Sequence, residues 1–316
     1  MCWEKNIASH FLKGGKYMAF ICFDVGGTAI KQGIFSVEGE LLEKDEFPTP
    51  HNDKESFYQS ILNVIEEYER TYEIQGIGLS MPGFIDPNEG KAITAGALYT
   101  LYEEKIVEVL QQNISYPIAI ENDANCAALA EQATGHAQET ANFLLITIGT
   151  GIGGAIVLNN ELFRGNTFRA GEFGLMHIDV ANHPFMTAHE LASTSALVRN
   201  YKEYKGLTPE TVVDARVIMQ EKEIDSGVQE LFEQWITYLA ALIFNSSTFF
   251  NPEKILLGGG ISADETLTPT LIKQLEKDNS WQEMKTIIQN CKYYNEAGLR
   301  GACVLISEKV KRNHEA

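Results

Sequence analysis

The sequence predicts an α/β protein built from two lobes with a cleft between them. Two glycine-rich segments, each lying between apolar β-type runs, open the two halves of the chain at 18–35 and 143–158. A third glycine cluster, Gly258–Gly260, stands between an apolar run and an expected helix. With 316 residues the chain can form two hydrophobic cores. One glycine hairpin per half, each followed by mixed α/β structure, indicates a coarse internal duplication.

In the first half, residues 18–35 predict a strand, a glycine turn and a second strand. An edge strand is expected in "ELLEKDEFPTP", after a turn at Glu38-Gly39. Apolar residues at helical spacing predict a helix over 54–69, with Asp53 as its N-cap. "IQGIGLSMPGFID" predicts a strand that ends at a Pro-Gly turn, and "LYEEKIVEVLQQN" (101–113) predicts a helix. "YPIAIENDANCAALAEQ" predicts a strand that runs into a helix.

The second half repeats this layout. The hairpin 143–158 precedes a turn at Asn159-Asn160 and another short strand. A long helix over 228–250 is expected to stop at Asn251-Pro252. "KILLGGGISADETL" predicts strand, glycine loop and helix, and "AGLRGACVLISEKV" predicts a terminal helix.

These elements predict three parts of the chain. Residues 1–17 show no clear period and are expected to be a disordered N-terminal extension. A small N-terminal lobe is expected over 18–122, completed by the C-terminal helix 300–316. A large C-terminal lobe is expected over 123–299.

Composition excludes several classes of protein. The chain is 44% hydrophobic and 22% charged, which is ordinary for a soluble globular protein, and its net charge of −18 argues against nucleic acid or an anionic membrane as partner. No apolar run is long enough to span a membrane, and no secretory signal is expected. Five scattered cysteines indicate free thiols in a reducing cytoplasm.

The segment "FLLITIGTGIGGAIVLNN" (143–160) carries Gly149, Gly151 and Gly154 at the spacing of a dinucleotide-binding fingerprint. That fingerprint needs a helix to start at the glycines, so that its N-terminus can hold the pyrophosphate. Here "AIVLNNELF" follows, which predicts strand, turn and strand. Glu172 lies at about the distance of an acidic ribose-binding residue, but in "AGEFG" rather than at a strand end. The segment is therefore expected to be a glycine-tipped hairpin.

Such a tip can bring several backbone N–H groups onto an anion, although a plain tight turn would look the same in this segment. The first hairpin favours the anion, because "FDVGGT" places a carboxylate at a strand end before two glycines. Two such hairpins and the "LLGGGIS" loop indicate nucleotide binding in a cleft between lobes. The predicted nucleotide-binding residues are Asp24, Gly26, Gly27, Thr28, Lys31, Gly149, Thr150, Gly151, Gly153, Gly154, Gly258, Gly259 and Gly260.

Asp123 is the predicted catalytic residue. Asn122 and Asp123 stand where an apolar strand meets a helix, and Asn and Asp are common helix N-caps. A carboxylate at a strand end is also where a base could accept a sugar hydroxyl proton during phosphoryl transfer. The helix N-terminus is expected to help keep Asp123 ionised. Glu172 and Glu190 are each either a solvated or capping acid or an acceptor for sugar hydroxyls.

The motifs "DVGGT", "ENDAN", "GTGIGGAIVLNNELFRG", "AGEFG" and "LLGGGIS", in this order, resemble the ROK family of bacterial sugar kinases and related repressors. The likeness covers about 19–310 and implies the actin/hexokinase-like (ribonuclease H-like) ATPase fold. It also implies ATP and Mg²⁺, transfer to a hexose hydroxyl (usually the 6-hydroxyl), and a homodimer. The sugar contacts that the resemblance implies are Gly83, in the Pro82-Gly83 turn, with Asn122, Asp123, Glu172 and Glu190.

Two departures from the family pattern stand out. Leu175 occupies the position of a family histidine, and the cysteines of a structural zinc loop are missing, so no zinc is expected. His177, His183 and His189 are expected to be surface or packing residues, with His177 as a candidate to replace the missing ring. In "TAGALYTL" (94–101), Gly96 and Ala97 stand where many members carry a sugar-binding Asn. This predicts a bulkier or substituted sugar, such as a β-glucoside or an N-acetylhexosamine (for example N-acetylmannosamine), with glucose or a similar hexose also a candidate substrate.

Three other functions compete with the kinase. A repressor would need a helix-turn-helix domain before the first hairpin, where 23 residues precede Asp24, and a charge suited to DNA. A catalytically silent sugar sensor would not need Asp123 together with phosphate loops. A general ATPase would not need the "ENDAN…AGEFG…HELAS" set.

Overall fold

The computed structural model describes residues 16–51 and 53–315. The chain divides into two compact units. The first runs to Ala130 and resumes at Glu296, and the second covers Glu131–Asn295. The expected extension 1–17 lies outside the described residues except for Lys16 and for Tyr17, where the first strand begins.

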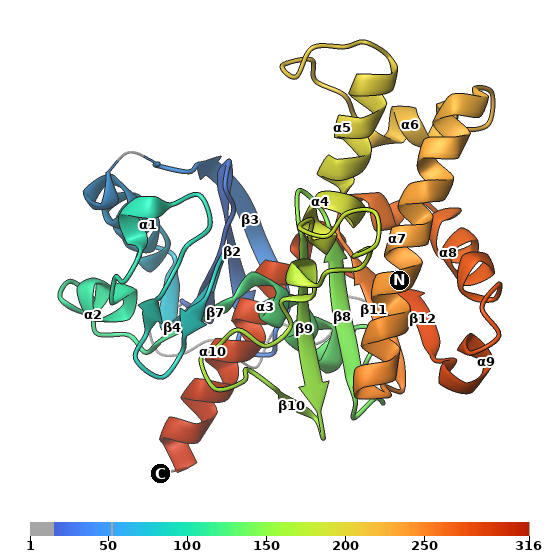
Figure 1. The fold of residues 1–316 in the computed structure, drawn as a ribbon. Coiled ribbons are helices and arrows are strands. Elements are labelled where there is room, and N and C mark those ends of the chain that lie inside the picture. Colours follow the sequence, from blue (N-terminus) through green and yellow to red (C-terminus); the bar gives the residue numbers. More distant parts are fainter. Residues whose placement is uncertain (1–15, 52, 316) are drawn as a thin grey trace, which may run out of the picture. The chain divides into compact units, whose positions relative to one another are not determined.

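The first unit is built on a five-stranded sheet of order β3-β2-β1-β4-β7. Strands β1, β2 and β3 form an antiparallel meander, as the glycine turn predicts, while β4 and β7 are parallel to β1. The bounds are β1 Tyr17–Val25, β2 Ala29–Ser36, β3 Leu41–Pro48, β4 Tyr72–Met81 and β7 Ile118–Asn122. A small two-stranded sheet, β5 (Ile85–Asp86) with β6 (Lys91–Ala92), follows β4. Strands β2, β3, β4 and β7 of the large sheet are labelled in Figure 1.

Two helices cover opposite faces of this sheet. Neighbouring residues of a strand point to these opposite faces, so each can contact a different helix. Ile77 shares an apolar core with Ile61 of α1 (Lys54–Glu69), which Asp53 caps as predicted. Gly78 faces the other way, and a Cβ there would lie 2.2 Å from the carbonyl oxygen of Ala302 in α10 (Ala297–Glu315). Glycine at this position therefore lets the C-terminal helix pack directly on β4.

The helix expected over 101–113 is wrong in its first part. The structure has a 3₁₀ turn at Tyr99–Leu101 and a short helix α2, Ile106–Gln111. Glu103 between them has φ of 59°, a left-handed conformation that interrupts a right-handed helix. Helix α3, Asp123–Thr134, follows β7 directly, as the sequence predicts.

The second unit repeats the sheet pattern with the order β10-β9-β8-β11-β12. Strands β8, β9 and β10 are antiparallel, and β11 and β12 are parallel to β8. The strand bounds are β8 Phe143–Ile148, β9 Ile152–Leu158, β10 Glu161–Leu162, β11 Lys254–Gly258 and β12 Ile287–Asn290. The equal strand order and direction in the two units confirm the predicted duplication.

Helix α7, Ser226–Phe250, supplies much of the second core, in which Trp235 and Ile243 share a cluster with residues of β8 and β11. It ends at Asn251 in a left-handed conformation, as the Asn-Pro signal predicts. The other helices are α4 Ala188–Ala192, α5 Thr194–Tyr204, α6 Ala215–Glu221, α8 Leu267–Leu275 and α9 Trp281–Met284. Among the described helices, none is long and apolar enough to cross a membrane.

A buried carboxylate joins two distant segments of the second unit. Glu131 is 0% exposed and accepts three backbone hydrogen bonds. One comes from His136 at 2.8 Å, and two come from Lys292 and Tyr293 at 2.6 and 3.1 Å. Because each donor would otherwise be left without this partner, Glu131 ties the end of α3 to the loop after β12.

Candidate functional site

The tip of the β1–β2 hairpin presents an anchored carboxylate beside exposed glycine backbone. Asp24, near the end of β1, lies opposite Lys31 in the strand register, and their side chains pair at 3.1 Å. Ser80 donates a hydrogen bond of 2.8 Å to Oδ1 of Asp24. Gly27 and Thr28 are exposed at the tip, and a Cβ on Gly27 would meet nothing within 4 Å. The tip is thus open to a ligand, while Gly26 is held by hydrogen bonds to Ala29 and Thr49.

The tip of the β8–β9 hairpin is formed by Gly149, Thr150 and Gly151. The two further glycines of the motif lie inside β9 and are paired with β8. Gly154 is buried, and a Cβ there would lie 2.4 Å from the ring of Phe173. Its role in the structure is therefore close packing, and it is not part of the loop where backbone N–H groups could gather on a phosphate.

The third glycine cluster lies against the second hairpin. Gly259 has φ of +90°, and a Cβ there would be 2.2 Å from the carbonyl oxygen of Ile148, so glycine is required for this contact. A Cβ on Gly260 would meet nothing within 4 Å. The structure thus brings together two of the three predicted glycine loops.

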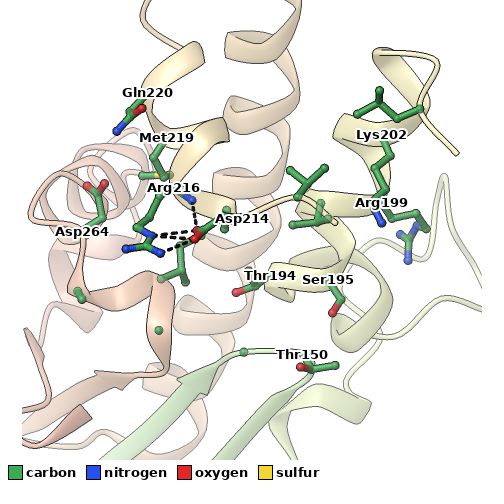
Figure 2. A pocket seen from close by; sticks show the side chains of 18 of the residues that line it. Thr150, Thr194, Ser195, Arg199, Lys202, Asp214, Arg216, Met219, Gln220 and Asp264 are labelled. Carbon is green, nitrogen blue, oxygen red and sulfur yellow. Dashed lines mark hydrogen bonds and ion pairs between the residues drawn. The ribbon is translucent and has the colours of Figure 1, made fainter. Parts of the chain in front are cut away.

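These two loops line a cavity of about 1300 Å³ within the second unit (Figure 2). Helix α5 contributes Arg199 and Lys202, and the segment around α6 contributes Asp214 and Arg216, whose side chains are hydrogen-bonded to each other. Further lining residues are Gly149, Thr150, Thr194, Ser195, Val198, Leu207, Met219, Gln220, Gly260, Ile261 and Asp264. The sequence did not predict the helical residues of this cavity, because the amphipathic pattern of a helix does not show which of its residues line a ligand cavity.

Asn122, rather than Asp123, caps helix α3. Its Oδ1 accepts backbone hydrogen bonds from Ala124 at 2.9 Å and from Asn125 at 3.1 Å. Its Nδ2 donates to Oδ1 of Asp123 and to the carbonyl oxygen of Gly83, both at 2.9 Å. One amide therefore starts the helix, holds the predicted base and fixes the turn after β4.

The Gly83 turn itself is tightly packed. Gly83 has φ of +89°, and a Cβ would lie 2.5 Å from the carbonyl oxygen of Thr94. The hydroxyl of Thr94 accepts a hydrogen bond from the backbone N–H of Phe84 at 2.9 Å. Any residue other than glycine would displace this turn from Asn122.

The pKa of Asp123 is raised to about 6. The first cause is that surrounding protein excludes water from the carboxylate, although the side chain still reaches solvent, and the second is the negative charge of Asp24. Hydrogen bonds from Ala124 and Asn122 act in the opposite direction and are outweighed. The hydrogen bonds at the helix N-terminus thus favour the ionised form, as expected, but the exclusion of water and the charge of Asp24 have the larger effect. A pKa nearer neutrality makes the carboxylate a stronger base.

In the second unit, Glu172 lies in a loop that packs closely on β9. A Cβ on Gly171 would lie 2.6 Å from the carbonyl oxygen of Gly154, and one on Gly174 would lie 2.4 Å from that of Ile152. Glu172 is half-buried at the start of the 3₁₀ turn Phe173–Leu175. Its position is thus set by two flanking glycines.

Glu190 forms a capping box with Thr187 at the start of α4. Its Oε2 accepts hydrogen bonds from the backbone N–H of Thr187 at 2.8 Å and from its hydroxyl at 3.1 Å, which lowers the pKa of Glu190. Glu190 therefore caps this helix, which is one of the two roles that the sequence leaves open for it.

The three histidines are placed differently from one another. His177 is exposed, and His183 packs edge-on against Tyr238 at a centroid distance of 6.2 Å. The ring of His189 lies against Gly174 and accepts a hydrogen bond of 2.8 Å from the backbone N–H of Ile152. His189, rather than His177, is therefore the ring that supports the loop of Glu172. Within 16–51 and 53–315, no group of three or more His, Cys, Asp or Glu residues could hold a metal ion.

Comparisons with known proteins agree with these motifs. The β-glucoside kinase of Listeria monocytogenes is 34% identical over 300 residues, which cover 94% of this chain and 100% of the relative. The N-acetyl-D-glucosamine kinase of Haemophilus influenzae is 28% identical over 90% of this chain and 98% of its own. The crystal structure of a ROK family protein from Streptococcus pneumoniae in complex with sucrose superposes with a TM-score of 0.83, at 31% identity, over 93% of this chain and 100% of the other.

This superposition, together with the duplicated sheet order, confirms the predicted actin/hexokinase-like α/β fold. The ROK family profile matches residues 20–309, nearly the whole chain. The protein belongs to the ROK family.

Proposed function

We propose that the protein is an ATP-dependent sugar kinase that phosphorylates a hexose hydroxyl, the 6-hydroxyl, of a β-glucoside. The observation that carries this proposal is Asp123, an accessible carboxylate with a pKa of about 6 at the start of α3, in a chain 34% identical to a β-glucoside kinase. A base for phosphoryl transfer needs this combination of access and basicity.

ATP is proposed to occupy the cavity of the second unit. Apolar Val198 and Ile261 suit the nucleoside, while Arg199 and Lys202 offer positive charge for phosphates. The backbone of the Gly149–Gly151 tip and of Gly260 is open to an anion, as is the β1–β2 tip at Gly27 and Thr28.

The described residues also fit the Mg²⁺ that accompanies ATP. Magnesium in kinase sites is held by one or two carboxylates together with substrate phosphates and water, so a cluster of protein ligands is not required. Asp24, fixed by Ser80 and Lys31 beside the exposed β1–β2 tip, is the carboxylate proposed to hold it. When bound, the ion would neutralise charge on the phosphates.

The proposed reaction moves one proton and one phosphoryl group. The sugar hydroxyl gives its proton to Asp123 while its oxygen forms a bond to the γ-phosphorus of ATP. The bond between the γ-phosphorus and the bridging oxygen breaks, and ADP leaves. The hydrogen bonds that Asp123 accepts from Nδ2 of Asn122 and from the backbone N–H of Ala124 both end on its Oδ1. Its Oδ2 is therefore the oxygen proposed to take the proton.

The predicted sugar-binding residues differ in how many of their polar atoms are already hydrogen-bonded within the protein. Gly83, Glu172 and Asp123 remain candidates for direct contact with the sugar. Asn122 uses both its donor and its acceptor groups within the protein, so we assign it the positioning of Asp123. Glu190 keeps one carboxylate oxygen outside its capping box and can still accept a hydroxyl.

A β-glucoside is favoured over glucose because Gly96 and Ala97 are small and exposed, which leaves room beside the sugar. An N-acetylhexosamine such as N-acetylmannosamine is the alternative substrate, supported by the N-acetyl-D-glucosamine kinase relative. An alternative from another functional class is a sugar sensor without catalysis.

A homodimer remains a prediction. A cytoplasmic location is supported by the four described cysteines, none of which forms a disulfide.

The test is a coupled assay of ADP release with glucose, cellobiose, N-acetylmannosamine and N-acetylglucosamine. Turnover should be fastest with the β-glucoside and should fall by a factor of about 100 to 10,000 in Asp123→Asn, which keeps the size of the side chain but removes the base. Sugar affinity, measured calorimetrically, should change little. Binding without turnover in the wild-type protein would instead identify a sensor, and full turnover by Asp123→Asn would refute the assignment of the base.

A further inference from the structure

Two exposed tyrosines stand together on the first unit. Tyr99 is 74% exposed and Tyr102 is 38% exposed, and their ring centroids are 5.5 Å apart with the rings tilted by 51°. The residues that directly precede them, Leu98 and Leu101, are 0% and 1% exposed. The 3₁₀ turn therefore buries one side of the segment and displays an aromatic surface on the other.

The displayed pair is held in place by the backbone beneath it. Leu98 and Leu101 donate backbone hydrogen bonds of 2.9 and 3.0 Å within the turn. The hydroxyl of Tyr102 donates to the carbonyl oxygen of Gly96 at 2.8 Å. Because the backbone and one ring are already fixed, stacking on this surface would require little further ordering of the protein.

A series of direct contacts connects this pair to the proposed base. Gly96 packs against Pro82, since a Cβ there would lie 3.2 Å from that ring. Pro82 precedes Gly83, whose carbonyl oxygen accepts from Asn122, and Asn122 also holds Asp123. All of these residues belong to the first unit. The aromatic surface and the base are therefore linked by a continuous series of contacts within the first unit.

We propose that Tyr99 and Tyr102 form a stacking surface for the aglycone, the group attached to the anomeric carbon of a β-glucoside. This inference rests on the proposed function. In a β-glucoside the hydroxymethyl group at C5 and the substituent at C1 are both equatorial, on the two carbons that flank the ring oxygen, and they point away from each other. A glucoside whose 6-hydroxyl is at Asp123 therefore carries its aglycone away from the base. Aryl groups and the C–H faces of sugars pack well on tyrosine rings. Gly96 and Ala97, which precede the tyrosines in the chain, are small and exposed, so they place no large side chain beside the rings.

The experiment compares kcat/KM for p-nitrophenyl β-glucoside, cellobiose and glucose in four proteins. Tyr99→Ala should lower kcat/KM for p-nitrophenyl β-glucoside by roughly threefold to tenfold, mainly through KM, because only the stacking contact is lost. Glucose, which has no aglycone, should be phosphorylated at the wild-type rate. Tyr99→Phe keeps the ring and should behave as the wild type. Phe249→Ala is the matched control, because Phe249 is an aromatic residue of similar exposure (81%) in the second unit, and it should leave all three substrates unchanged.

The outcomes separate this inference from the proposed function. If the wild type phosphorylates β-glucosides and Tyr99→Ala reduces glucose and glucosides equally, or neither, the stacking surface is refuted while the kinase assignment stands. If the wild type phosphorylates only N-acetylhexosamines, the β-glucoside assignment and the aglycone surface fail together. Selective loss with the glucosides, restored in Tyr99→Phe, supports the inference.

Discussion

Replacing Asn122 separates the two tasks that its amide performs in the structure. Its Oδ1 caps α3, and its Nδ2 holds both Gly83 and Asp123. Asn122→Ala removes all of these contacts. Asn122→Ser loses the amide donor but keeps an oxygen that can cap the helix, since serine is one of the preferred N-cap residues. The pair of variants therefore distinguishes helix capping from positioning of the base.

The expected loss of stability follows from the contacts. Removing an N-cap costs about 1 kcal/mol of unfolding free energy. Losing the hydrogen bond to the carbonyl oxygen of Gly83 costs about 1 kcal/mol more. Asn122→Ala should therefore lower the unfolding free energy of the first unit by about 2 kcal/mol, and Asn122→Ser by about 1 kcal/mol. Urea unfolding followed by circular dichroism measures both values.

The effect on activity is a shift of the pH profile. In the wild type the pKa of Asp123 is about 6, so kcat/KM should fall as the pH drops through about 6 and the base becomes protonated. The Asn122 hydrogen bond lowers that pKa, so both variants should raise it and move the acid limb to higher pH, with activity recovering in alkaline buffer. ADP release measured across the pH range tests this. An acid limb that stays in place in both variants would refute the positioning role, whatever the loss of stability.

Two further substitutions test packing in the second unit. Gly154→Ala places a methyl group against Phe173 and should cost about 1–3 kcal/mol of unfolding free energy, whereas Gly260→Ala, which meets open space, should stay within about 0.5 kcal/mol. Equal losses in thermal or urea unfolding would contradict the packing role of Gly154. Glu131→Ala removes the acceptor of three backbone N–H groups and should cost about 3 kcal/mol or more, while Glu131→Gln should cost less because an amide oxygen remains. A near-wild-type melting temperature for Glu131→Ala would refute the importance of this link.

Local patterns were sufficient to predict most of the fold. The two glycine hairpins, the strand of 118–122 that runs into a helix, and the stop at Asn251 all depend on neighbours in the chain. The rejection of a dinucleotide fold also depended on local pattern, and the structure confirms it, because β9 continues through Gly154. The helix expected over 101–113 failed at Glu103, whose left-handed backbone has no clear sequence signal.

The sequence by itself determined the α/β class, the duplicated glycine hairpins and the family, because spacing along the chain carries each of these. Only the tertiary structure decided that Asn122 rather than Asp123 caps α3, that Gly154 serves packing, and that α5 and α6 line the cavity. It alone also raised the pKa of Asp123, through exclusion of water and the charge of Asp24. Apart from the cap, which is a local contact of Asn122 with Ala124 and Asn125, these properties arise from contacts between residues far apart in sequence, and such contacts exist only once the chain has folded.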